Sequence, residues 1–320
     1  FYIERELSKR MNIPVFHDDQ HGTAIISSSA LLNGLELVGK KIGDVKVAVS
    51  GAGAAAIACL DVMVALGVNP KNVFACDSKG LIYTGRAGGF DDSKARYAQP
   101  DTGARTLADV VKGADVFLGC SAPGVLTGEM VKTMADKPII LALANPEPEI
   151  RPEEAKAARP DCIIATGRSD YPNQVNNVLC FPYIFRGALD CGATKITEAM
   201  KLACVHEIAN LAKAETSAEV AAAYAGKDLQ FGPDYIIPTP FDPRLITRIA
   251  PAVARAAVES GVAERPITDM EAYRTSLERF VYQTGMVMRP VYDAAKAVPH
   301  DRKRVAYAEG EEERVLRAAQ

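Results

Sequence analysis

The stretch Lys46–Asp77, KVAVSGAGAAAIACLDVMVALGVNPKNVFACD, decides the fold of this chain. It opens with the apolar run Val47–Val49, which is typical of a parallel strand buried on both faces. A glycine turn follows, and then an Ala- and Leu-rich segment, Ala54–Leu66, that predicts a helix. A second apolar run, Val73–Cys76, ends on an acid. The order strand, glycine turn, helix, strand, acid is that of a dinucleotide-binding unit.

Each position of the glycine turn has a chemical reason in such a unit. Gly51 would allow the tight turn, Gly53 would let backbone approach a pyrophosphate, and Ala56 is small enough for close packing of helix on strand. The helix start would offer free N–H groups and the positive end of its dipole to the phosphates. Asp77 would reach the adenosine ribose from the tip of the second strand. A glycine turn alone also fits any α/β protein, so the flanking strands and the acid support the prediction.

Composition narrows the class of protein. The 320 residues suggest about two domains, and the 48% hydrophobic content supports large cores. A formal net charge of −3 does not point to nucleic acid or to a membrane surface, and no apolar run is long enough to span a bilayer. The seven cysteines are scattered without a CxxC pair, which favours reduced core thiols in the cytoplasm.

The pattern along the chain predicts an α/β fold with a second, mostly helical part. Apolar runs predict strands at 13–16, 47–49, 73–76, 116–119, 138–142 and 162–165. Helical patterns alternate with them through about residue 165, which predicts a doubly wound parallel sheet of Rossmann type. The later helices are expected at 179–189, 197–214, 243–258 and 270–298. The tail at 304–308 predicts one further strand, followed by a charged helix.

The run His17-Asp18-Asp19 is a candidate metal site. Two adjacent carboxylates at a strand end are costly unless a positive charge neutralises them, and Mg²⁺ or Mn²⁺ would do so through oxygen ligands. The alternative is a solvated turn in which Asp19 caps the next helix. His17 and His21 flank the acids but give too few ligands for a zinc site.

Three asparagines are candidates for ligand binding. Asn145 follows a predicted strand, and Asn176-Asn177 lie in a later loop. Ligands of open α/β sheets bind outside the carboxyl ends of the strands, where these amides would gather with Gly51 and Asp77. They would hold a nicotinamide, a ribose or a substrate carboxylate. The alternative is ordinary Asx-turn chemistry, which such loops commonly contain.

At this point the sequence resembles a known family. The string IPVFHDDQHGTA at Ile13–Ala24 is similar to the signature of malic enzymes, the decarboxylating malate dehydrogenases. The blocks Gly51–Ala55, Ala144–Pro146 and Ser169–Leu189 resemble later blocks of the family, in the right order. The resemblance covers roughly residues 1–290. Residues 289–320 resemble the start of a phosphate acetyltransferase domain, a pairing similar to the large bacterial hybrid malic enzymes.

The resemblance implies roles for particular residues. Asp19 matches a metal-ligating aspartate, and Asp18 matches a neighbour that supports the catalytic lysine. Asn145 and Asn177 match residues at the nicotinamide and at the malate carboxylate, so Asn145 is expected to contact both cofactor and substrate. The remaining cofactor contacts are expected at Gly51, Ala52, Gly53, Ala54, Ala55 and Asp77. A Glu-Asp metal pair, a tyrosine acid and a lysine base would lie upstream of Phe1, so we expect a segment cut at both ends.

The activity implied is oxidative decarboxylation of malate to pyruvate and CO₂, with reduction of NAD or NADP and with Mg²⁺ or Mn²⁺. The helical C-terminal part of the chain favours a homo-oligomer, and the resemblance implies an acetyl-CoA-type regulator acting through the missing C-terminal domain. The expected organisation is a metal-motif region (1–24), an NAD(P)-binding domain (25–195), a helical part (196–288) and a linker with the next domain's start (289–320).

Two other functions fit parts of the pattern. Amino-acid and methylene-tetrahydrofolate dehydrogenases share the dinucleotide unit but do not need the Asp18-Asp19 pair. A non-catalytic nucleotide-binding or assembly module would need neither acid nor base. The sequence also leaves the cofactor open, because Asp77 favours NAD by hydrogen-bonding a ribose diol, whereas Ser78 and Lys79 would receive the 2′-phosphate of NADP.

Overall fold

The computed structural model describes residues 2–214, 229–281 and 294. Phe1–Tyr273 form one compact unit, and Arg274–Gln320 cluster as a second. Four predictions fall wholly or partly outside the described residues: the strand at 304–308, the charged helix after it, the helix at 270–298 beyond residue 281 and the domain start at 289–320.

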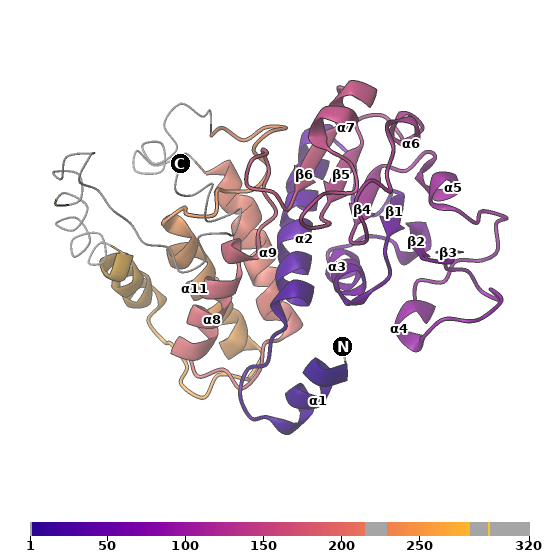
Figure 1. Cartoon of the computed structure of the whole chain (residues 1–320). Helices are drawn as coiled ribbons and strands as arrows, with labels where there is room; N and C mark the ends of the chain where they lie inside the picture. The colour runs from indigo at the N-terminus through magenta and orange to yellow at the C-terminus, as the bar shows by residue number, and fades with distance from the viewer. Residues whose placement is uncertain (1, 215–228, 282–293, 295–320) are drawn as a thin grey trace. The chain divides into compact units, whose positions relative to one another are not determined.

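A six-stranded sheet organises the first unit, with strand order β3-β2-β1-β4-β5-β6 (Figure 1). All neighbours are parallel except the edge pair β2–β3. The chain fills one side of β1 first and then crosses to the other, which confirms the predicted doubly wound sheet. The strands are β1 Val47–Ser50, β2 Val73–Asp77, β3 Gly80–Leu81, β4 Val116–Gly119, β5 Ile139–Ala142 and β6 Ile163–Thr166.

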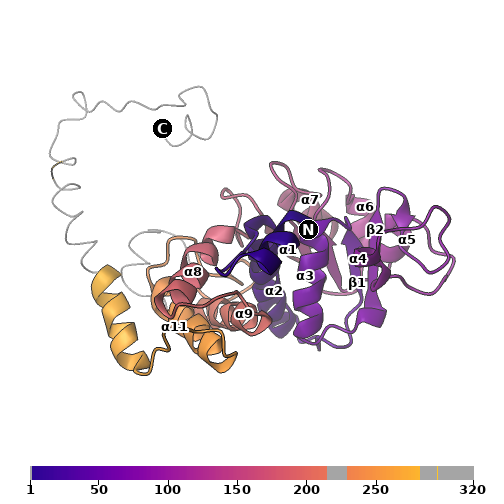
Figure 2. The ribbon, with the colours of Figure 1, turned by 90° about the horizontal axis from the view of Figure 1, so that it is seen from below.

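Helices cover both faces of the sheet. The structure has α1 Tyr2–Arg10, α2 Asp18–Val38, α3 Ala54–Ala65, α4 Asp92–Ala95, α5 Leu107–Val111, α6 Gly128–Lys132 and α7 Pro152–Ala158. These are followed by α8 Phe181–Asp190, α9 Glu198–Lys213 and α11 Arg244–Glu259. Helix α2 lies between the sheet side of the unit and the α8, α9 and α11 group (Figure 1). Helix α1 lies below α2 in Figure 1 and therefore in front of it when the molecule is seen from below (Figure 2).

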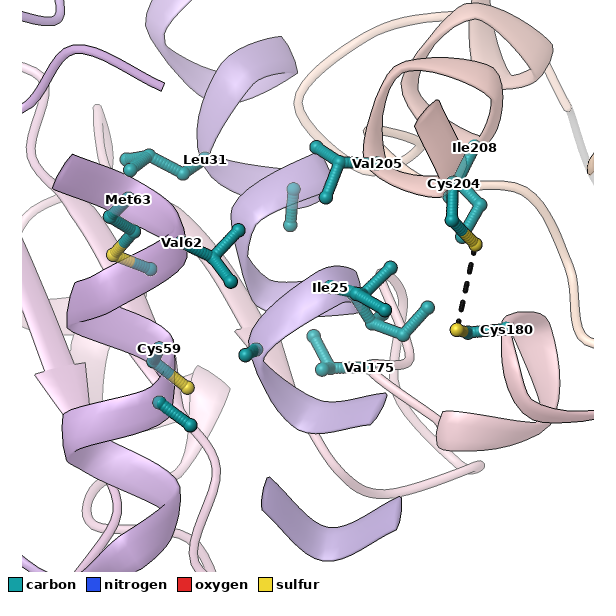
Figure 3. Close-up of a cluster of buried hydrophobic side chains, with 14 of the residues drawn as sticks. Ile25, Leu31, Cys59, Val62, Met63, Val175, Cys180, Cys204, Val205 and Ile208 are labelled. Atoms are coloured by element: carbon teal, nitrogen blue, oxygen red, sulfur yellow. Dashed lines mark hydrogen bonds between the residues drawn. The ribbon is translucent and has the colours of Figure 1, made fainter. Parts of the chain in front are cut away.

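Side-chain alternation along the strands divides the interior into two cores. Val47, Val49 and their counterparts on neighbouring strands pack with α2, α3 and α9. Ala48 and Phe117 point the other way, into a second core with α5, α6 and α7. Figure 3 shows the first core, where side chains of α2, α3 and α9 interdigitate around Ile25. The strands are therefore buried on both faces, as their continuous apolar runs predict.

The structure differs from the sequence predictions in three local features. Residues 13–16 form no strand, because this extended segment pairs with no neighbour. Asp18 and Asp19 lie in the first turn of α2 rather than at a strand end, and the helix dipole favours negative charge there. The antiparallel strand β3 was not expected, because two residues are too few to show a periodic pattern. Among the described residues, no helix is long and apolar enough to cross a membrane.

Candidate functional site

The strands end in register along one edge of the sheet. Ser50 is the partner of Cys76 on one side and of Gly119 on the other, and Gly119 in turn pairs with Ala142. We call this row of strand ends and the loops that follow it the strand-end edge. The connections reverse direction between β1 and β4, which is where open α/β sheets bind their ligands.

The glycine turn lies at the centre of the strand-end edge. Gly51 has φ +103°, and a Cβ there would lie 2.5 Å from the carbonyl oxygen of Cys120. Gly53 is the N-cap of α3 in an extended conformation, and a Cβ there would meet nothing within 4 Å. The backbone conformation and the close Cys120 carbonyl therefore require glycine at Gly51. At Gly53 neither applies, and the space beside it is open. No side chain caps α3, so its first N–H groups face that space, and Ala56 is buried.

Asp77 ends β2, but its carboxylate is already engaged. Arg86 donates to both oxygens, at 2.8 Å each, and the backbone N–H of Lys79 donates at 2.9 Å. The ammonium of Lys94 lies 3.4 Å away. The hydrogen bonds from Arg86 are the main reason why the pKa of Asp77 falls to about 2. Little acceptor capacity is left for a ribose diol, while the cationic side chains of Arg86 and Lys94 both contact the acid.

The loops after β4 and β5 meet at the other half of the edge. Asn145, which follows Ala144 in the loop after β5, is exposed. The peptide bond between Asn145 and Pro146 is cis. Ser121 is exposed as well, and its hydroxyl lies 2.8 Å from that of Ser50. Glu149, which the sequence patterns did not single out, is fully buried between these loops.

A second group of polar residues gathers where α2 begins; we call Asp18, Asp19, Thr23 and Asn177 the α2 corner. Asp19 is exposed and Asp18 is half-buried. The N-cap is His17, without a side-chain cap, so Asp19 does not cap this helix. Asp18 Oδ1 is buried without a hydrogen-bond partner, and burial raises the pKa of this carboxyl.

Asn177 completes the α2 corner from 159 positions away in the sequence. Its amide donates to Asp18 Oδ2 at 3.1 Å, and its oxygen accepts from Thr23 at 3.3 Å. Gly22 makes room for this contact, because a Cβ there would lie 3.1 Å from Cγ of Asn177. Asn176, in contrast, accepts from Val178 N in an Asx turn. Asn176 therefore follows the Asx-turn alternative, whereas Asn177 contacts Asp18 and Thr23 of α2.

A chain of charged groups behind the α2 corner was missed by the sequence analysis. His21 Nε2 lies 2.8 Å from Glu4 on α1, and its Nδ1 lies 3.2 Å from the ammonium of Lys201 on α9. Lys201 also binds Glu198 at 2.7 Å. Burial and the Lys201 charge lower the pKa of His21. Glu198 and Lys201 are three residues apart on α9, but no sequence spacing connects them with His21 on α2 or Glu4 on α1.

The described residues contain no group of three or more His, Cys, Asp or Glu side chains that could hold a metal ion. Asp19 is therefore not joined by two further such ligands within this part of the chain. Carboxylate oxygens at the α2 corner still match the preference of Mg²⁺ and Mn²⁺ for hard ligands.

Comparison with known proteins identifies the family of this chain. Residues 20–224 match the family described as malic enzyme, NAD binding domain. The NADP-dependent malic enzyme of Escherichia coli (strain K12) is 65% identical over 320 residues, which are 100% of this chain and 42% of the relative. The NAD-dependent malic enzyme of Rhizobium meliloti is 61% identical and is covered to 41%. The chain thus spans about two fifths of the length of these curated relatives.

A solved structure agrees with the fold. The crystal structure of malic enzyme from Pyrococcus horikoshii superposes with a TM-score of 0.79 at 35% sequence identity. The match covers 92% of this chain and 66% of that one.

Proposed function

This chain belongs to the malic enzyme family, and from that premise we propose that it acts in the oxidative decarboxylation of malate to pyruvate and CO₂. The observation that supports its part most directly is the open space at Gly53, in front of the uncapped N-terminus of α3. A pyrophosphate fits that place because it needs N–H donors and the absence of a side chain. Bound NAD(P) would accept the hydride from the substrate alcohol.

Different residues of the strand-end edge would bind different parts of the cofactor. Gly51 to Ala55 would hold the pyrophosphate, with the adenosine on the β2 side of the turn. The nicotinamide would then extend toward Asn145 on the β5 side, because β2 and β5 lie on opposite sides of β1.

We assign the NAD(P)-binding domain to residues 25–195 and the helical part to 196–288. The metal motif would lie in 1–24, and a further domain would start at 289.

We favour NADP as the cofactor. Asp77 is bound by Arg86 and Lys94, so its charge is offset and its oxygens are occupied. Lys79 follows Asp77 two residues later and adds a positive charge, so the β2 side of the strand-end edge would attract a 2′-phosphate. The relatives are named for either cofactor, since the Rhizobium meliloti protein is NAD-dependent and the Escherichia coli protein is NADP-dependent.

The α2 corner would serve substrate and metal. Asp19, as an exposed carboxylate, would be one ligand of Mg²⁺ or Mn²⁺, which when bound would polarise the substrate oxygens. Asp18, held by Asn177, keeps a buried oxygen free to accept a hydrogen bond from a cationic base. Asn177 and Asn145 would contact malate, and the acid and base implied by the resemblance would complete the site.

Location and assembly are part of the same proposal. The seven cysteines are free thiols, a state that the reducing cytoplasm maintains. A homo-oligomer is expected from the helical C-terminal part of the chain, and an acetyl-CoA-type regulator from the family resemblance.

The activity is tested in a polypeptide that joins this chain to the upstream segment implied by the resemblance. Malate should drive reduction of NADP only when Mg²⁺ or Mn²⁺ is present, and NADP should be preferred to NAD. A non-catalytic nucleotide-binding module would bind NADPH but leave malate unchanged. An amino-acid or methylene-tetrahydrofolate dehydrogenase would turn over its own substrate without the metal.

A further inference from the structure

A buried carboxylate joins two loops of the strand-end edge. Glu149 lies between β5 and α7 and is 0% exposed. Its Oε1 accepts a hydrogen bond from Ser121 N at 2.9 Å, and its Oε2 accepts one from Ala144 N at 3.0 Å. The two donors lie in different loops, one after β4 and one after β5. One side chain therefore sets the distance between these loops.

The fold makes room for this carboxylate at a cost. A Cβ on Gly119, the last residue of β4, would lie 2.6 and 2.7 Å from the Glu149 oxygens. Burial raises the pKa of Glu149, since an ionised group loses its hydration there. A carboxylate offers two oxygens that only accept, which matches two N–H donors. A glutamine of the same shape would set its NH₂ group against one of them.

Hydrogen bonds connect Glu149 with the ends of three neighbouring strands. Ser121, held by Glu149, also lies 2.8 Å from Ser50 through the two hydroxyl groups, so the ends of β5, β4 and β1 are connected. Asn145 follows directly after the anchored Ala144. Glu149 thus fixes the backbone N–H of the exposed Ser121 and that of Ala144, which directly precedes the exposed Asn145.

We propose that Glu149 is a positioning residue that holds the loops after β4 and β5 where they receive the nicotinamide of the bound cofactor. It does not touch the cofactor, because it is buried beneath both loops. The inference rests on the proposed cofactor binding. It goes further by separating the nicotinamide half of the site, which depends on Glu149, from the phosphate half at Gly53, which does not.

The test compares two ligands on the full 320-residue chain. NADPH carries the nicotinamide, whereas ADP-ribose has the adenosine and the pyrophosphate without it. Glu149→Gln should weaken NADPH binding at least about fivefold, because one loop loses its acceptor, and should change the Kd of ADP-ribose less than about twofold. The aspartate side chain of Glu149→Asp is too short to reach both N–H groups, so this variant should show the same selective loss of NADPH binding. It replaces Glu149→Gln in the test if that variant does not fold.

Glu154→Gln is the matched control, because Glu154 also accepts a backbone N–H bond, from Gly128 at 3.2 Å, but is exposed on α7. It should leave both dissociation constants unchanged. If the Glu149 variants leave both constants unchanged, or weaken both ligands equally, the positioning role is overturned. If the unsubstituted chain binds neither ligand, the proposed cofactor site fails as well, so the two failures are distinguishable.

Discussion

The strand-end edge and the α2 corner are built in different ways. The glycine turn consists of consecutive residues between β1 and α3, and its geometry follows from two glycines and the helix start. The α2 corner brings Asp18 against Asn177, which is 159 positions away. A local motif predicts its own geometry, whereas a corner assembled from distant segments depends on the packing of the whole unit. The predictions below test how far the two regions are independent.

Gly51→Ala should have the largest effect on stability, because the turn is the most constrained point of the strand-end edge. An alanine would need φ near +103° and would press its Cβ against the Cys120 carbonyl. The free energy of unfolding should fall by about 3 kcal/mol. Urea unfolding followed by circular dichroism measures the loss. A change within about 0.5 kcal/mol would show that the turn relaxes and is not a rigid part of the edge.

Arg86→Ala should cost less and only in one range of pH. Asp77 has a pKa of about 2 in the folded chain, below its ordinary value of 3.8, mainly because of Arg86. A lowered folded pKa stabilises the chain above pH 4, and this contribution disappears as the pH falls toward 2. The variant should lose about 2 kcal/mol at pH 7 and clearly less at pH 3. A deficit independent of pH would mean that lost packing, not the ion pair, dominates.

Asp19→Asn tests the α2 corner alone, in the polypeptide that includes the implied upstream segment. The amide keeps the shape of the ligand but loses the charge facing a dication, so Mn²⁺ should bind at least about tenfold more weakly, or about 1.4 kcal/mol. NADPH affinity should not change, because the strand-end edge is separate. Titrating activity with Mn²⁺, and NADPH by fluorescence, measures both. Normal Mn²⁺ affinity would remove Asp19 from the metal site; a parallel loss of NADPH binding would show that the regions are coupled.

The sheet and the glycine turn could be predicted because their signals are local. Continuous apolar runs marked the five parallel strands within one or two residues, and the turn followed from its glycines. The edge strand β3 could not be found, because two residues form no pattern. The strand expected at 13–16 failed because an apolar run does not supply a pairing partner.

The site was harder to predict where contacts are distant. Asp77 was expected to be available to a ribose, but Arg86, in an irregular loop, occupies it. Glu149 gave no signal, since one of several glutamates in a polar stretch resembles any solvated acid, and only the fold buries it. The loop position marked Asn177 as a candidate and the family resemblance gave it a role, but nothing in its spacing indicates the contact with Asp18.

The most direct test of the cofactor site is the affinity of Gly53→Val for NADPH, beside the control Gly43→Val. Gly43 precedes β1 at the opposite end of that strand, and a Cβ there would lie 3.6 Å from the nearest atom, an ordinary contact. Both variants should fold, since the space beside Gly53 is open in the protein itself. The Gly53 variant should bind NADPH at least about a hundredfold more weakly, or about 2.7 kcal/mol, because valine would fill the place of the pyrophosphate, while the control binds normally. Unchanged affinity of a folded Gly53→Val chain would contradict the assignment of the cofactor phosphates to this turn.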